Sequence, residues 1–149
     1  MIQSVITSVV LAASVLWFGA GFVQFTVRSR GSARGLVPRQ FRDHALVDVV
    51  AGLLRFLGGL NLAFAVLALL LLTRRDTFAS SAVLASCLLV FAVAHVSQFA
   101  VNVPLAQQER RGREPLWPVL HGTMLIIFVG DGLLACANAA LALTGLLHQ

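Results

Sequence analysis

Apolar residues are concentrated in four long stretches of the chain, separated by shorter segments that carry arginine, glycine and proline. The stretches cover residues 2–27, 46–73, 80–103 and 116–147. Each is longer than the ~20 residues that an α-helix needs to cross ~30 Å of hydrocarbon. Because lipid offers no partner to backbone N–H and C=O groups, such stretches must fold as helices. The pattern therefore predicts four transmembrane helices.

The segments between these stretches are short, so successive helices are expected to pack as antiparallel neighbours. The chain has no internal repeat and no segment with the composition of a soluble domain. Gly31, Gly35 and Pro38 are expected to keep the first connection, residues 28–45, free of helix. The sequence thus predicts an all-α integral membrane protein, a single domain over residues 1–149 with four transmembrane helices in an up-down antiparallel bundle.

Composition supports lipid as the main solvent. Hydrophobic residues make up 58% of the chain, charged residues 11%, and the mean hydropathy is +0.89. Soluble domains carry about 25% charged residues. The first apolar stretch lacks a basic start and exceeds the length of a signal-peptide core, so we interpret it as a retained span. Cys87 and Cys136 lie inside apolar stretches and are interpreted as small packing residues.

The positions of the arginines predict the orientation in the membrane. The net charge is +5, but ten of the eleven arginines lie in or beside the breaks between spans, which argues against nucleic-acid binding. The connections 28–45 and 104–115 hold five and three arginines, whereas the connection 74–79 holds two. The positive-inside rule then places the first and third connections in the cytoplasm, and both termini outside, in a bacterial inner membrane.

Polar side chains inside the spans are the candidates for function, because charge is expensive in hydrocarbon and tends to face a cavity or a partner. His95, Gln98 and Asn102 stand at i, i+3 and i+7 and share one helical face. Asp131 lies deep in the fourth span, where apolar surroundings disfavour the charged carboxylate and favour a proton donor. The pattern predicts a polar pocket that opens to the cytoplasm and ends at Asp131.

The first functional hypothesis is a membrane enzyme that performs acid–base chemistry without a diffusible cofactor or metal. Asp131 would be the general acid, and His95 the base or its relay. The reaction would be isomerisation, cyclisation or epoxide opening of a terpenoid, polyketide or quinone-like molecule. The expected partners are this lipophilic substrate, membrane lipids and a possible second copy of the chain. The predicted substrate-binding residues are Arg55, Asn61, Gln98, Asn102, His121 and Trp17.

Two other classes remain open from the sequence. One is a membrane anchor subunit that binds haem b or a quinone, with His95 and His121 as axial ligands on neighbouring helices. The other is a small proton-coupled transporter or binding protein, in which Arg55 and Asp131 would serve the coupling.

The second span contains the stretch Arg-Phe-Leu-Gly-Gly, residues 55–59, in its first half. Together with the size and the helix count, this stretch resembles small DoxX-like bacterial four-helix proteins. The resemblance covers one helix and implies a four-helix fold without implying a particular activity.

Overall fold

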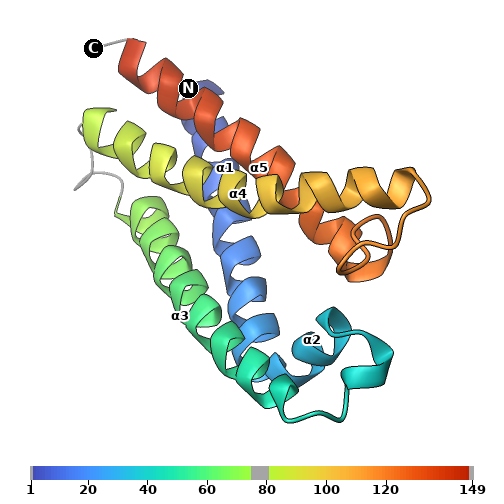
Figure 1. Cartoon of the computed structure of the whole chain (residues 1–149). Coiled ribbons are helices and arrows are strands. Elements are labelled where there is room, and N and C mark those ends of the chain that lie inside the picture. The colour runs from blue at the N-terminus through green and yellow to red at the C-terminus, as the bar shows by residue number, and fades with distance from the viewer. Residues whose placement is uncertain (1, 75–80, 148–149) are drawn as a thin grey trace. The chain divides into compact units, whose positions relative to one another are not determined.

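The computed structural model describes residues 2–74 and 81–147. All regular secondary structure in this part of the chain is helical (Figure 1). A π-helical turn η1 (Val23–Val27) continues the first helix, and a 3₁₀ turn η2 (Arg39–Phe41) follows the second. The α-helices are α1 (Ile2–Phe22), α2 (Ser29–Leu36), α3 (Leu46–Thr73), α4 (Ser81–Arg110) and α5 (Gly122–Leu147).

Four helices are long and apolar enough to cross a membrane. They are α1 together with η1, then α3, α4 and α5. The predicted all-α fold class is confirmed. Residues 75–79 of the second connection, with Arg75 and Asp76, lie outside the described residues, as does the predicted start of the third span at residue 80.

The chain falls into two compact units. The first, which we call the α4–α5 unit, comprises Met1–Ser14 and Ala68–Gln149. The second, the α2–α3 unit, comprises Val15–Leu67. The prediction of a single domain over the whole chain stays a prediction.

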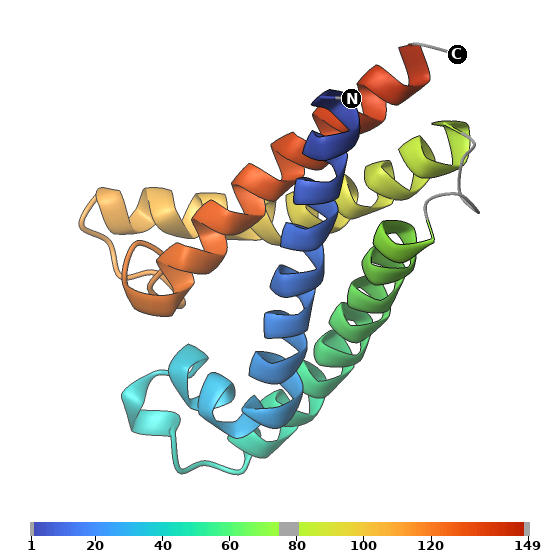
Figure 2. The same ribbon diagram turned by 180° about the vertical axis from the view of Figure 1, so that it is seen from behind.

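In the α4–α5 unit, α4 and α5 run in opposite directions and lie side by side (Figures 1 and 2). The buried residues of α5 are Asp131, Ala135, Asn138 and Ala142. Their spacing of i, i+4, i+7 and i+11 places them on one face of the helix. The first half of α1 reaches this face, since Asn138 Nδ2 donates to Ser14 Oγ at 3.5 Å. Two of the four residues on the buried face of α5 are therefore polar.

In the α2–α3 unit, glycines let the second half of α1 and α3 approach closely. A Cβ at Gly58 would meet the side chain and the backbone nitrogen of Thr26, and one at Gly21 would meet the Asn61 amide. Nearby, the rings of Phe18 and Phe64 pack with their centroids 5.1 Å apart. Small residues in these spans thus serve helix packing, as in membrane proteins generally.

The prediction that residues 28–45 contain no helix is wrong. Helix α2 forms there despite Gly31 and Gly35, because one of its faces packs onto α3. Ala33 is fully buried in a cluster with Val47, Ala51 and Leu54. Tertiary packing of this kind outweighs weak helix propensity.

Two predicted boundaries move in opposite directions. Helix α4 continues through Pro104 to Arg110, seven residues past the predicted end at residue 103. A proline removes one backbone hydrogen bond, and a long helix held by its neighbour tolerates that loss. Helix α5 begins at Gly122 rather than at residue 116. Pro115, Pro118 and the positive φ angle of Gly122, 57°, keep the preceding segment irregular.

Candidate functional site

The α4–α5 unit brings together the two residues that the sequence singled out for acid–base chemistry. His95 Nδ1 lies 2.9 Å from Asp131 Oδ1, and both side chains have 0% exposure. His95 is in the middle of α4, and Asp131 is in the third turn of α5. Burying a lone carboxylate or imidazolium is costly, whereas a hydrogen-bonded pair with no net charge is tolerated. We call this pair the His95–Asp131 dyad.

The dyad belongs to a stripe of α4 residues that faces α5 and the segment before it. The stripe runs through His95, Phe99, Asn102, Ala106 and Glu109, with the i, i+4, i+7 spacing of a helical face. Gln98, predicted to share this face, is only half-buried. Its backbone carbonyl accepts a hydrogen bond from Asn102 Nδ2 at 2.9 Å.

An aromatic stack lies one helical turn from the dyad. The rings of Phe99 and Phe128 are parallel within 6°, with centroids 4.6 Å apart. Phe99 follows His95 by four residues, and Phe128 precedes Asp131 by three, so both rings neighbour the dyad. Gly132 makes room for the stack, because a Cβ there would lie 3.0 Å from Cε2 of Phe99.

Asn102, predicted to orient the substrate, holds a tryptophan from the loop. The indole Nε1 of Trp117 donates to Asn102 Oδ1 at 3.0 Å. The Asn102 side chain is 6% exposed. Its acceptor oxygen therefore fixes the segment of residues 111–121 against α4.

Glu109 is a site residue that the sequence reasoning missed. Its Oε2 accepts hydrogen bonds from the backbone N–H groups of Val119 and Leu120, both at 2.9 Å. Its Oε1 pairs with His121 Nδ1, a ring whose side chain is 78% exposed. Glu109 thus anchors the segment before α5, and His121 lies at the exposed end of the unit.

This placement does not favour His95 and His121 as ligands of one haem. His95 is bonded to Asp131, whereas His121 precedes Asp131 by ten residues, about 15 Å of helix rise. Two axial ligands must instead face one iron from opposite sides. In residues 2–74 and 81–147, no three His, Cys, Asp or Glu side chains gather closely enough to hold a metal ion.

Polar groups continue along α5 on the other side of the dyad. Asn138 is two turns beyond Asp131, is fully buried, and donates to the carbonyl of Leu134 at 2.9 Å. Its Oδ1 is buried and accepts no hydrogen bond from the described residues. Ser14 beside it is also fully buried, and Thr7, two turns earlier on α1, is 6% exposed. These groups form a buried polar line.

The other predicted site residues belong to the α2–α3 unit. Arg55 is exposed and its Nε donates to Ser29 Oγ at 3.3 Å. Asn61 is 4% exposed and its Nδ2 donates to the carbonyl of Leu57 at 2.8 Å. Trp17 is half-buried. A role for these three residues in one site with the dyad stays a prediction.

Comparison of the chain with known protein families, curated proteins and solved structures gives no match.

Proposed function

We propose that the protein is a small membrane enzyme that performs acid–base chemistry on a lipophilic molecule, with the His95–Asp131 dyad as its catalytic pair. The supporting observation is the 2.9 Å hydrogen bond between two titratable side chains that are both fully buried. A pair of this kind inside a membrane span is a functional candidate by default.

The dyad suits a reaction that moves a proton within one substrate. Asp131 would give a proton to one atom of the substrate, and His95 would take a proton from another through Nε2. Exchange with water then restores the starting state, because Nε2 releases the proton that it took and Asp131 takes up a proton in place of the one that it gave. Because one proton is given and one is taken, isomerisation or cyclisation would need no diffusible cofactor.

Access to the dyad would require the aromatic stack to move. Phe99 is half-buried and packs over Gly132, next to Asp131. Side-chain and helix motions that admit a substrate are common in enzymes. A path lined by Phe99 and Phe128 suits an apolar molecule arriving from the bilayer, such as a terpenoid, polyketide or quinone-like substrate.

The proposed orientation places the connections 28–45 and 104–115 in the cytoplasm and both termini outside, on the positive-inside rule. A reporter fused to the C-terminus tests this orientation in a bacterial inner membrane. We expect an alkaline phosphatase fusion to be active, since that enzyme folds in the periplasm, and a fluorescent-protein fusion to be dark. The reverse pattern would overturn the orientation.

The proposed chemistry can be tested before the substrate is known. The purified protein is incubated in D₂O with membrane-lipid extract and with the lipids that co-purify with it, and the products are analysed by mass spectrometry. We expect one lipophilic species to gain deuterium at carbon with the wild-type protein. The label should be lost with Asp131→Asn and with His95→Gln.

Glu114→Gln is the control, because it removes the charge of a titratable side chain at an exposed position of the same unit. This variant should label as the wild type does. Equal labelling by the wild type and both dyad variants would contradict the proposal, as would no labelling by any of them.

A second candidate is proton-coupled transport, and the buried line of Asn138, Ser14 and Thr7 favours it. Asn138 shares the buried face of α5 with Asp131 and contacts Ser14, and the Oδ1 of Asn138 offers an acceptor to an internal water. In proteoliposomes under a pH gradient, this function would give proton flux that Asn138→Leu abolishes, with no deuterium at carbon. Labelling at carbon supports the enzyme instead.

A further inference from the structure

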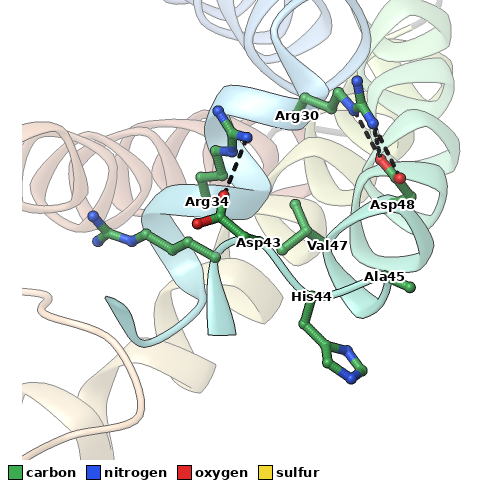
Figure 3. Close-up of a pocket in the computed structure, with 8 residues that line it drawn as sticks. Arg30, Arg34, Asp43, His44, Ala45, Val47 and Asp48 are labelled. Atoms are coloured by element: carbon green, nitrogen blue, oxygen red, sulfur yellow. Dashed lines mark hydrogen bonds and ion pairs between the residues drawn. The ribbon is translucent and has the colours of Figure 1, made fainter. Parts of the chain in front are cut away.

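A small cavity of about 140 Å³ lies between α2 and the start of α3, in the α2–α3 unit (Figure 3). Figure 3 shows Arg30 and Asp48 on one side of it, and Arg34 and Asp43 on another. The eight lining residues are Arg30, Arg34, Arg42, Asp43, His44, Ala45, Val47 and Asp48. We call this cavity the arginine pocket.

The walls of the arginine pocket are held in place by packing. Ala33, between the two α2 arginines, is fully buried against Val47, Ala51 and Leu54 of α3. Ser32 on the same helix accepts a hydrogen bond from Gln24 Nε2 at 2.9 Å and donates one to the Gln24 carbonyl at 2.8 Å. Packing and hydrogen bonds therefore hold α2 in place. Arg30 and Arg34, at positions i and i+4, project from one side of this helix.

The arginines keep hydrogen-bond donors for a ligand. Arg30 is held by Asp48 through Nε and Nη2, at 2.8 and 3.0 Å. The hydrogen bond to Asp48 raises the pKa of Arg30, so that its guanidinium group stays charged. The contact between Arg34 Nη2 and Asp43 Oδ1 is long, at 3.7 Å, and the Asp43 side chain is 97% exposed. Arg42 donates Nε to the Val37 carbonyl at 3.4 Å.

A guanidinium carries five N–H donors in a planar fork that matches phosphate oxygens. Arg34 and Arg42 therefore retain most of their donors, and the three arginines outnumber the two aspartates of the pocket. Asp43 is the weak competitor for this site, because an incoming phosphate would only need to replace one long and solvent-exposed contact.

The position of the pocket along the chain indicates a membrane lipid. The apolar run of α3 begins at Leu46, within the segment that lines the pocket, so the pocket lies at the level where lipid headgroups meet a span. Leu46 and Val49 are 56% and 58% exposed, which leaves apolar surface for acyl chains beside the arginines. We propose that the arginine pocket binds the phosphate of an anionic membrane lipid. Basic pockets beside transmembrane helices recognise such headgroups.

The test uses the full-length protein in nanodiscs that contain phosphatidylcholine and phosphatidylglycerol, with retained lipid read by native mass spectrometry. We expect the wild type to retain phosphatidylglycerol over phosphatidylcholine. The double variant Arg34→Gln/Arg42→Gln should reduce this preference by about tenfold or more, since each arginine near a headgroup contributes substantially. Arg110→Gln/Arg111→Gln removes the same charge at the C-terminal end of α4 and should keep the preference.

Asp43→Asn provides a gain of binding that does not depend on a damaged fold. It removes the competing carboxylate from an exposed position and should increase retention of phosphatidylglycerol. Unchanged or weaker retention in this variant would overturn the proposal, as would equal losses in the two arginine double variants. A free phosphate is distinguished by adding inorganic phosphate or glycerol 3-phosphate: if either displaces the lipid at millimolar concentration, the ligand is a soluble phosphate.

Discussion

Each unit of this protein holds an acid–base pair, and the two pairs occupy opposite surroundings. In the α4–α5 unit, His95 and Asp131 are both 0% exposed. In the α2–α3 unit, the Arg30 and Asp48 side chains are 73% and 60% exposed. The Arg30–Asp48 pair has the shorter contact, 2.7 Å against 2.9 Å. Contact length therefore does not determine which pair matters more for the protein.

The solvent exposure of each pair decides how much its loss costs the protein. Water solvates either partner of the exposed pair when the other is removed, so little is lost. The buried pair has no such alternative, and removing one partner leaves a polar group without compensation in an apolar interior. The comparison makes the dyad the sensitive point of the α4–α5 unit, and it makes the arginines of the α2–α3 unit free to exchange partners.

The largest effect is expected from breaking the dyad on one side. His95→Ala or Asp131→Ala should each lower the free energy of unfolding by about 3–5 kcal/mol, because each leaves a buried partner behind. Denaturant titration of the detergent-solubilised protein measures this loss. The double variant His95→Leu/Asp131→Leu is the control, since replacing both partners by apolar groups is often neutral. Single variants as stable as the double variant would show that the dyad is not buried as described.

The next effect concerns helix approach, and it compares glycines of the two units. Gly58→Ala should destabilise by about 1–3 kcal/mol, because overpacking forces the backbone to shift. The new Cβ would lie 2.9 Å from the backbone nitrogen of Thr26. Gly132→Ala should cost less, since it meets only the Phe99 ring, which can rotate.

Gly59→Ala serves as the control, because a Cβ at Gly59 has nothing within 4 Å. It should stabilise α3 by up to about 1 kcal/mol through helix propensity. The same denaturant titration measures all three variants. If Gly58→Ala behaved as Gly59→Ala does, the close approach of α1 and α3 would be wrong.

A local effect is expected at the pair of intermediate exposure, Glu109 and His121. Glu109→Ala removes the acceptor of two backbone N–H groups, so the amides of Val119 and Leu120 should exchange with solvent on the order of tenfold faster. Hydrogen exchange read by mass spectrometry over the segment 111–121 measures this. Glu109→Gln keeps an acceptor oxygen and should retain part of the protection. Unchanged exchange in Glu109→Ala would mean that Trp117 and Asn102 alone hold the segment.

The spans and the dyad residues were predictable because both follow from local pattern. Long apolar runs need only a count of residues, and His95 and Asp131 stand out as titratable groups deep inside such runs. Their direct contact was not predictable, because it depends on the rotation of α4 relative to α5. The same rotation explains why Phe99, rather than Gln98, takes the place next to the dyad.

The missed features depend on contacts between distant segments. Glu109 lay outside the predicted third span, which ended at residue 103. An acidic residue in a helix that continues past a proline was the only signal for it. The pairing of Asn102 with Trp117 joins a helix to a loop, and helix α2 depends on Ala33 fitting against α3. None of these contacts produces a periodic pattern of hydrophobic and polar residues that could be recognised in the sequence.

The smallest effect is expected at the exposed pair, and this variant tests the comparison most directly. Arg30→Gln should leave the unfolding midpoint in neutral detergent unchanged within error, because both partners remain solvated. The pair should also add no pH dependence from its arginine. The hydrogen bond to Asp48 raises the pKa of Arg30 in the folded protein above its pKa in the unfolded chain. The stability that this gives is present below the unfolded-state pKa and is lost only as the pH rises through the folded-state pKa, which lies above the pH range of the experiment. If Arg30→Gln instead destabilised the protein as strongly as His95→Ala, exposure would not separate the two pairs, and the ion pair of α2 would be a structural element of the α2–α3 unit.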